Sequence, residues 1–379
     1  MTTDSAPSTP GSAALVVSAH AHERGGADGC HTIRHRGGVP AARCIGPRAA
    51  VRQRDRRAGE GSRPRRRLGH LGVPDVPVRV RHRSGAHARA GGFAARRHAP
   101  YARRSRPENA LVAATGAPLT QSGAPLISPS KHYDDVSTLL GQLTRQHAVN
   151  GLHVHVEVFG DEQRVRALRR VRAWLPVLLA LSANSPFSYG VTSGLASWRS
   201  VLIRRLPVSW APPEFCDADE YHRTVEQLVT IGLLPSRGST SWAVRLSERF
   251  DTVEVRVADA QLRVDDALLL ASLMRAIVVA EDLPDAVPPP AELDASLWLA
   301  ARHGMQARLF TPDGGIEDAW SATQRMMQGI RDAVAEQGDE EFVDEHLSRL
   351  RSEGTGSQRQ LRAYESGGVQ ALGGLYREW

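Results

Sequence analysis

Two short segments of the chain alternate valine with polar side chains. The valines are Val154, Val156 and Val158 in residues 152–159, and Val253, Val255 and Val257 in residues 252–258. Because successive side chains of a β-strand point to opposite faces, each segment is predicted to be a strand with one β-branched face on a core and one polar face. We expect helices to pack on the valine faces of these strands.

Segments with apolar residues at helical spacing surround these strands. They are residues 132–147, 161–181, 219–231, 265–280, 291–302, 316–336 and 340–352. Pro176 is expected to kink the second of these helices. Further strands are predicted at 242–246 and within the Ala/Gly/Pro/Ser-rich residues 109–130, and residues 184–200 are predicted to be a loop. Strands and helices alternate irregularly, so the predicted fold class is α+β.

The charge of the chain changes sign along its length. Residues 1–107 contain 22 arginines and 6 acidic residues, so the remainder must carry −9 to give the net charge of +7. The first segment contains one phenylalanine and no tryptophan. It therefore has little apolar surface to offset an ordering cost of roughly 1–2 kcal/mol per residue. We predict an irregular or disordered Arg/Ala/Gly-rich segment at 1–107 and a folded domain at 108–379.

Three interpretations of residues 1–107 differ in function. A basic arm that binds nucleic acid would explain the charge, but the segment lacks interleaved aromatic residues, and the only lysine, Lys131, lies outside it. A transit peptide is also Arg-rich, yet this segment is too long and too rich in glycine and proline for an amphipathic helix. Misread GC-rich codons give the same composition. We favour this frame error, with a disordered arm as its rival.

Several classes of protein are disfavoured by the sequence. The cysteines, Cys30, Cys44 and Cys216, have no metal-binding or disulfide-framework spacing, which suits a reducing compartment. No apolar run approaches the ~20 residues that span a bilayer, and no secretory signal is evident. We therefore expect a cytoplasmic protein. The absence of GxxxxGK[ST] and GxGxxG motifs argues against P-loop and Rossmann folds.

The polar faces of the two strands carry groups that bind metal ions and phosphates. These residues are His153, His155 and Glu157 in the first strand, and Thr252, Glu254 and Arg256 in the second. Carboxylates and imidazoles can hold a divalent cation, and a guanidinium can pair with a phosphate or carboxylate. An ordinary half-solvated sheet is one alternative. A His-x-His zinc site is another, although no third ligand has typical spacing.

Five motifs occur in order along the chain: Gly151–Val156, Trp174–Phe187, Gly194–Ser200, Thr252–Asp259 and Ala301–Gly304. Together they resemble the type 2 glutamate–cysteine ligase family of bacterial ATP-dependent carboxylate–amine ligases, from about residue 110 to the C-terminus. The resemblance implies a glutamine-synthetase-like fold, with a curved antiparallel sheet that forms a cleft and helices behind it. It also implies that ATP, with Mg²⁺, phosphorylates a carboxylate, usually that of glutamate. An amine, typically that of cysteine, then attacks the acyl phosphate.

The resemblance also implies roles for individual residues. His153 and Glu254 would be metal ligands, and Arg256 would contact the transferring phosphate or the activated carboxylate. Arg199 would clamp a substrate carboxylate, with a solvated loop arginine as the alternative. His155 would contact the nucleotide or brace its neighbour.

Other matching positions are less informative. Glu157 stands where the family more often has a small residue, Asn184-Ser185-Pro186 is better interpreted as a helix end, and Arg302 and Gly304 are assigned to packing. The predicted partners are glutamate and cysteine or another amine. We expect neither a membrane nor nucleic acid, and a homodimer is compatible with the sequence.

The family normally opens with a strand that ends in a glutamate cluster of the type V-E-E-E, which binds metal–ATP. Residues 1–107 contain only Glu23 and Glu60. If Arg24 uses a CGN codon, Arg24–Ala27 read one base later becomes GNG-GNG-GNG-CNG, which permits Glu-Glu-Glu-Leu. We therefore predict a glutamate–cysteine ligase-type enzyme with weak or lost activity in the chain as it stands. The alternative is an inactive ligase scaffold with a nucleic-acid-binding arm.

Overall fold

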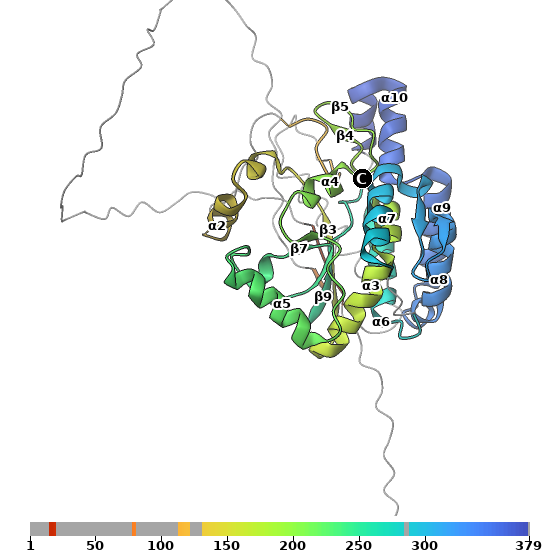
Figure 1. The fold of residues 1–379 in the computed structure, drawn as a ribbon. Coiled ribbons are helices and arrows are strands. Elements are labelled where there is room, and N and C mark those ends of the chain that lie inside the picture. Colours follow the sequence, from red (N-terminus) through yellow and green to blue (C-terminus); the bar gives the residue numbers. More distant parts are fainter. Residues whose placement is uncertain (1–14, 20–77, 81–112, 122–130, 284–287, 378–379) are drawn as a thin grey trace, which may run out of the picture.

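The computed structural model describes residues 15–19, 78–80, 113–121, 131–283 and 288–377. Its central element is an open five-stranded sheet (Figure 1). The strands in spatial order are β2 (Val78–Val80), β1 (Leu15–Ala19), β3 (Leu152–Glu157), β9 (Thr252–Val255) and β8 (Val244–Leu246). Every neighbouring pair is antiparallel. With helices behind this sheet, the predicted α+β fold class is confirmed.

The valine faces of β3 and β9 pack together on the core. Val154 pairs with Val255, and Val156 pairs with Val253, and all four side chains are fully buried. Two helices, α3 (Asp161–Ser182) and α6 (Val264–Val279), cover this face. Because the valines occupy alternate positions, the register that buries them leaves the polar side chains on the opposite face.

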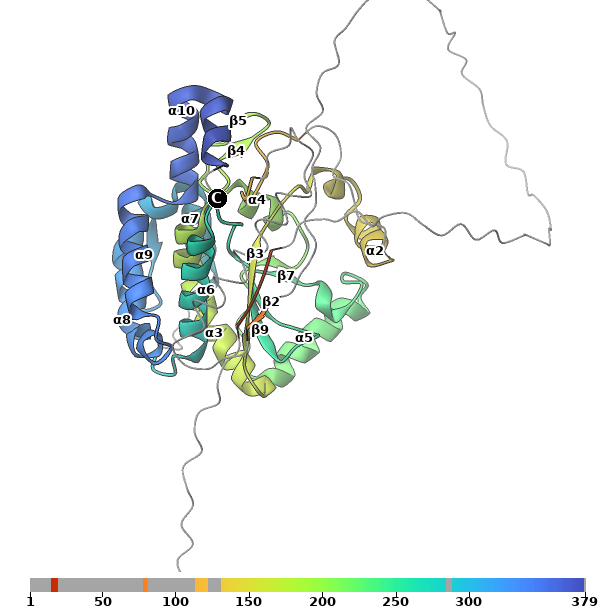
Figure 2. The ribbon, with the colours of Figure 1, turned by 180° about the vertical axis from the view of Figure 1, so that it is seen from behind.

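Further helices form a second layer behind α3 and α6. They are α7 (Pro290–His303), α8 (Ala319–Glu336) and α9 (Glu340–Glu353), followed by α10 (Gly356–Leu375). Helix α7 packs on α3, while α8 and α9 pack on α6. Figures 1 and 2 place α8 and α9 on the side of the sheet opposite to α2 and α5. The polar face is therefore turned away from the main helical layers.

Short elements connect the layers, and some of them surround the polar face. The helices are α2 (Lys131–Leu140), η1 (Gly141–Gln146), α4 (Trp198–Arg204), α5 (Ala218–Thr230), η2 (Arg237–Ser239) and η3 (Gly304–Gln306). The strand pairs are β4 (Phe187–Ser188) with β5 (Val191–Thr192), β6 (Ser209–Trp210) with β7 (Ser241–Trp242), and β10 (Arg308–Phe310) with β11 (Ile316–Asp318). Asp217 caps α5 by accepting a hydrogen bond from the backbone N–H of Glu220 at 2.7 Å.

The structure differs from the sequence predictions at several element ends. Residues 316–318 form a strand that pairs with β10, and α8 begins only at Ala319, because Asp318 caps it by accepting from the backbone N–H groups of Trp320 and Ser321. Pro176 lies inside the continuous helix α3, and the kink expected there stays a prediction. Helix α10 was not predicted, since glycines interrupt its apolar pattern. A strand was predicted within 109–130; the described part, residues 113–121, contains none, and the rest of that range lies outside the described residues.

Most of the Arg-rich segment 1–107 lies outside the described residues. Its predicted irregular character and the frame hypothesis therefore stay predictions. Two stretches of it, β1 and β2, are strands of the main sheet, and Ser18 of β1 pairs with His153 of β3. Among the helices of the described residues, none is long and apolar enough to cross a bilayer.

Candidate active site

The carboxylate of Glu254 lies at the centre of a buried cluster on the polar face of the sheet. Glu254 is 3% exposed, and β9 pairs it with His155 on one side and Arg245 on the other. Arg245 Nε donates to Glu254 Oε2 at 2.7 Å, and Arg256 Nη1 donates to Oε1. One buried carboxylate is thus hydrogen-bonded by two guanidinium groups, an arrangement of strong charge-assisted bonds.

The two histidines of β3 also face this carboxylate. His153 Nδ1 lies 3.5 Å and His155 Nε2 lies 3.6 Å from Glu254 Oε1. Arg256 Nη1 is 3.2 Å from His153 Nδ1. Because a guanidinium only donates, Nδ1 of His153 must accept in this contact, which assigns the proton of a neutral ring to Nε2. His155 Nδ1 is 3.0 Å from the hydroxyl of Thr252.

The charges in this cluster shift each other's protonation. Burial by itself would raise the pKa of Glu254, but the charge of Arg256, the contact with His155 and the charge of Arg245 outweigh it and hold the pKa well below its usual range. Burial, and then repulsion by Arg245, lowers the pKa of Arg256 to about 10 despite the attraction of Glu254. Both groups are therefore charged at neutral pH.

Arg199, at the start of α4, is fixed by backbone and side-chain acceptors. Its Nη1 donates to the carbonyl oxygen of Val257 at 3.1 Å, and its Nη2 donates to that of Arg256 at 3.0 Å. Its Nη1 lies 3.7 Å from Oδ1 of Asp259. Gly151 lies against this guanidinium, and a Cβ at that position would collide with it. Arg199 is therefore a held, buried side chain and not a solvated loop arginine.

Asp259 connects Arg199 to the loop that follows α3. Its carboxylate accepts hydrogen bonds from the backbone N–H of Asn184 at 2.8 Å, from the hydroxyl of Ser185 at 2.7 Å and from the hydroxyl of Ser197 at 2.9 Å. Burial raises the pKa of Asp259, although Arg199 and these donors oppose the shift. Asn184 was interpreted as part of a helix end, and it also belongs to this buried network.

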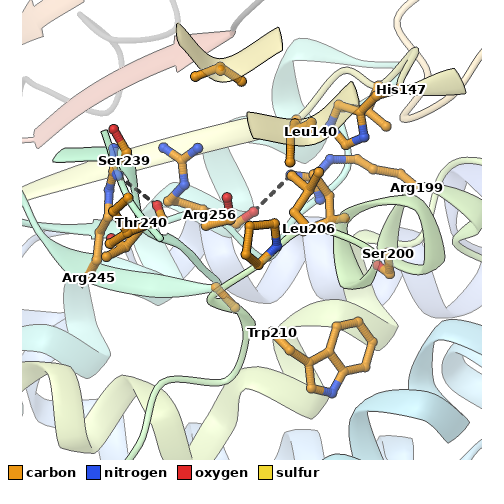
Figure 3. Close-up of a pocket in the computed structure, with 18 of the residues that line it drawn as sticks. Leu140, His147, Arg199, Ser200, Leu206, Trp210, Ser239, Thr240, Arg245 and Arg256 are labelled. Atoms are coloured by element: carbon orange, nitrogen blue, oxygen red, sulfur yellow. Dashed lines mark hydrogen bonds between the residues drawn. The ribbon is translucent and has the colours of Figure 1, made fainter. Parts of the chain in front are cut away.

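A pocket with a volume of about 390 Å³ opens over the polar face of the sheet. Its polar lining includes His153, Arg199, Arg245 and Arg256. Figure 3 shows Arg245 and Thr240 on one side of the pocket and Arg199 on the other, with Arg256 between them. The pocket wall therefore carries three cations, Arg199, Arg245 and Arg256. The carboxylate of Glu254 is hydrogen-bonded to the last two and does not line the pocket.

The predicted site residues differ in their relation to this pocket. His153, Arg199 and Arg256 line it. His155 and Glu254 lie in the cluster behind the wall, and Glu157 lies at the end of β3, where it pairs with Thr252. The site roles assigned to these residues stay predictions.

Two contributors to the site were not predicted. Arg245 alternates with Val244 and Leu246 in the predicted strand 242–246, so the same period-two pattern could have identified it. Asp259 follows the second valine strand. Asp259 is buried because the loop Asn184–Ser197, which is distant in sequence, folds against it. No local sequence pattern reveals this contact.

The side chains of this cluster can be judged as possible ligands of a magnesium ion. Mg²⁺ prefers oxygen ligands in octahedral geometry. Both oxygens of Glu254 already accept from arginines, and Nδ1 of His153 accepts from Arg256. Within the part of the chain that the structure describes, no three His, Cys, Asp or Glu side chains gather as metal ligands. The described residues by themselves therefore do not form a magnesium site.

The fold and the site together define an α+β protein with an arginine-lined pocket on the polar face of an open antiparallel sheet. The model of glutamate–cysteine ligase family 2 matches residues 83–377. The chain belongs to this family. The match begins inside the Arg-rich segment and includes all the site residues described above.

Curated relatives carry names that agree with the family. "Putative glutamate–cysteine ligase 2-1" of Saccharopolyspora erythraea is 35% identical over 252 residues, which cover 65% of this chain and 67% of the relative. "Putative glutamate–cysteine ligase 2" of Salinispora arenicola is 36% identical over 259 residues, which cover 66% of this chain and 68% of the relative. Family and relatives support a ligase-type function.

A solved structure supports the fold. The crystal structure of a bifunctional glutathione synthetase from Pasteurella multocida matches with a TM-score of 0.53 and 18% sequence identity. The match covers 73% of this chain and 43% of that chain, so this chain spans less than half of the larger protein. At this identity the likeness shows the fold alone.

Proposed function

We propose that this chain is an ATP-dependent carboxylate–amine ligase of the glutamate–cysteine ligase type, with residues 108–379 as its catalytic domain. The observation that carries the proposal is the arginine wall of the pocket, formed by Arg199, Arg245 and Arg256. Such a reaction brings together a nucleoside triphosphate and a carboxylate, both of which are anions. A site for it therefore needs fixed positive charge, and these three cations supply it.

The proposed reaction has two steps. A carboxylate oxygen of glutamate attacks the γ-phosphorus of ATP, the bond to the bridging oxygen breaks, and ADP leaves while an acyl phosphate forms. The amine nitrogen of the second substrate then attacks the acyl carbon, phosphate leaves, and the nitrogen loses a proton. Arg256 would neutralise charge on the transferring phosphoryl group, and Arg199 would hold a substrate carboxylate.

Glu254 has a supporting part in this proposal. Because its pKa lies well below the usual range, it stays ionised at neutral pH and holds Arg245 and Arg256 in place. Without that carboxylate, two guanidinium groups would repel each other on the pocket wall. The hydrogen bonds to Glu254 therefore orient both guanidinium groups before substrates bind.

The proposal includes Mg²⁺ together with ATP, but the two predicted ligands, His153 and Glu254, already accept hydrogen bonds from arginines. The carboxylates of the family's first strand would have to hold the ion. In this structure β1 lies beside β3, and its residues Leu15–Ala19 include no carboxylate. We therefore propose that the chain as it stands has weak activity.

A coupled assay of ADP release tests the proposal. With glutamate, cysteine, ATP and magnesium, we expect slow ADP release that requires both glutamate and the amine. If ADP release does not depend on glutamate, the proposal is wrong. If no turnover occurs and the chain shows salt-sensitive nucleic-acid binding that is lost on deletion of 1–107, the inactive scaffold with a basic arm replaces it.

A further inference from the structure

The pocket over the sheet has two chemically different walls. One wall carries the arginines described above, and the other is apolar. The apolar lining includes Leu140 of α2, Ile203 of α4, Leu206, Trp210 and Leu234. Substrates that are purely ionic would leave this second wall in contact with water, which is unfavourable for so many large apolar groups.

Three apolar side chains of this wall do not belong to a protein core, whereas Leu234 is 3% exposed and Trp210 packs on the larger hydrophobic cluster. Leu140, Ile203 and Leu206 are each half-buried. None of the three packs in either of the two hydrophobic clusters formed by the described residues. Their apolar surface therefore faces the pocket, which is the usual composition of a small-molecule site with a few convergent polar groups.

Two buried polar atoms of the same pocket have no partner among the described residues. They are Nε of Arg199 and the hydroxyl of Thr240, whose residues are 4% and 2% exposed. A buried donor without a partner is costly. Arg199 is also a cation that lines the pocket, so a ligand group beside it would be an anion, such as a carboxylate.

The positions of Arg199, Ile203 and Leu206 connect the two walls. Arg199 and Ile203 are four residues apart in α4 and lie on the same helix face. The chain continues that face to Leu206, whose N–H donates to the carbonyl oxygen of Ile203 at 2.9 Å. A molecule with its carboxylate at Arg199 would lay its side chain along Ile203 and Leu206.

The backbone next to this wall is also unusual. Val208 and Trp210 have φ angles of 51° and 73°, a region that L-residues with a side chain rarely adopt. Such strain persists where the surroundings require it, and it gathers at ligand sites. The guanidinium carbon of Arg204 lies 4.9 Å from the centre of the Trp210 indole ring.

We propose that the amine substrate is an α-amino acid with a branched aliphatic or aromatic side chain, and that α4 selects it by pairing Arg199 with its carboxylate and Ile203 and Leu206 with its side chain. This inference rests on the proposed ligase function. Cysteine offers only one methylene group and a thiol, which would leave most of the apolar wall uncovered. Each buried methylene changes binding by roughly tenfold or more.

Calorimetric titration of the full chain with L-leucine, L-phenylalanine and L-cysteine tests this inference. We expect Kd values for leucine and phenylalanine about tenfold or more below that for cysteine. Ile203→Ala should remove most of this difference, by weakening leucine and phenylalanine binding far more than cysteine binding. Ile231→Ala is the matched control, because Ile231 is 73% exposed and lies outside the pocket. Thermal unfolding shows whether each variant is folded.

Other outcomes overturn the inference in distinct ways. Cysteine binding as tightly as leucine, or no amino acid binding at all, would refute the apolar specificity. Competition between ATP and phenylalanine would assign the apolar wall to the nucleotide base instead. In each case glutamate-dependent ADP release with cysteine would leave the proposed ligase function standing. Leucine binding without any ADP release would contradict the ligase function but not the pocket's preference.

Discussion

Nη1 of Arg199 lies 3.7 Å from Oδ1 of Asp259, and both side chains are buried. Asp259 is bound in turn by Asn184, Ser185 and Ser197. The direction of Arg199 into the pocket is therefore set by residues that never reach the pocket themselves. The proposed contact of Arg199 with a substrate therefore depends on this network.

Asp259→Asn should destabilise the fold. An amide cannot accept from all three donors, and Arg199 loses its counter-charge, so we expect a loss of about 1–3 kcal/mol in the free energy of unfolding. Urea unfolding measures it. Asp332→Asn, on the exposed face of α8, is the matched control and should change stability by less than about 0.5 kcal/mol. Equal stability of Asp259→Asn and wild type would refute the anchoring role.

Gly151→Ala should weaken substrate binding through Arg199. The new Cβ would collide with the guanidinium, which must then move, and a displacement of about 1 Å at a reacting site can cost on the order of 100-fold. We expect KM for the amino-acid substrate whose carboxylate Arg199 holds to rise about tenfold or more. Gly374→Ala is the control, since nothing lies within 4 Å of its added Cβ. Unchanged KM values for both amino-acid substrates in Gly151→Ala would mean that Arg199 does not contact a substrate carboxylate.

Glu254→Gln should lose stability in a way that depends on pH. The folded pKa of Glu254 lies below its ordinary value of 4.5, so its contribution is fully present above that value. As the pH falls, the unfolded chain takes up a proton that the folded chain does not, and the contribution declines. The difference in unfolding free energy between wild type and Glu254→Gln should thus be largest near about pH 7 and shrink toward about pH 3.

The matched control for this measurement is Glu248→Gln, because Glu248 is exposed. Taking the difference between variants removes the contribution of Asp259, whose raised pKa has the opposite effect on stability as the pH changes. A difference for Glu254→Gln that grows as the pH falls would show that the carboxylate is not held ionised by its arginines.

The gene should contain a one-base frame change upstream of codon 108. Correcting it is expected to place a glutamate cluster where Arg24–Ala27 now stand, and the corrected protein should release ADP faster, because carboxylates for Mg²⁺ are restored. Nucleotide sequencing decides the first part. A reading frame in which no single-base correction yields an acidic cluster would rule this explanation out.

Much of the fold could be predicted because alternation and helical spacing are local signals. Val154 and Val255 are buried on the face that their spacing predicted, and the structure brings His153, Glu254 and Arg256 together. Arg256 follows directly after β9, and its N–H still donates to the carbonyl oxygen of Ala243 at 2.7 Å. That bond keeps Arg256 on the predicted face beyond the end of the regular strand.

The rest of the site depends on contacts between distant segments. Asp259 meets Asn184 across 75 positions of sequence, and Gln360 of α10 donates to Asn184 Oδ1 at 2.6 Å across 176 positions. Neither contact has a local signature. The wall formed by Ile203 and Trp210 was also not predicted, because a short helix and a turn with positive φ have no apolar period long enough to detect.

Trapping of the acyl phosphate with hydroxylamine tests the central claim most directly. With ATP, magnesium and glutamate, the chain should form a glutamyl hydroxamate and ADP in equal amounts, however slowly. Arg256→Gln should reduce the rate by about 10²–10³-fold, as expected for loss of one preorganised charge, while Arg331→Gln on the exposed face of α8 should not. Hydroxamate formation that is the same in both variants, or ADP release that needs no glutamate, would contradict a ligase site at this arginine-lined pocket.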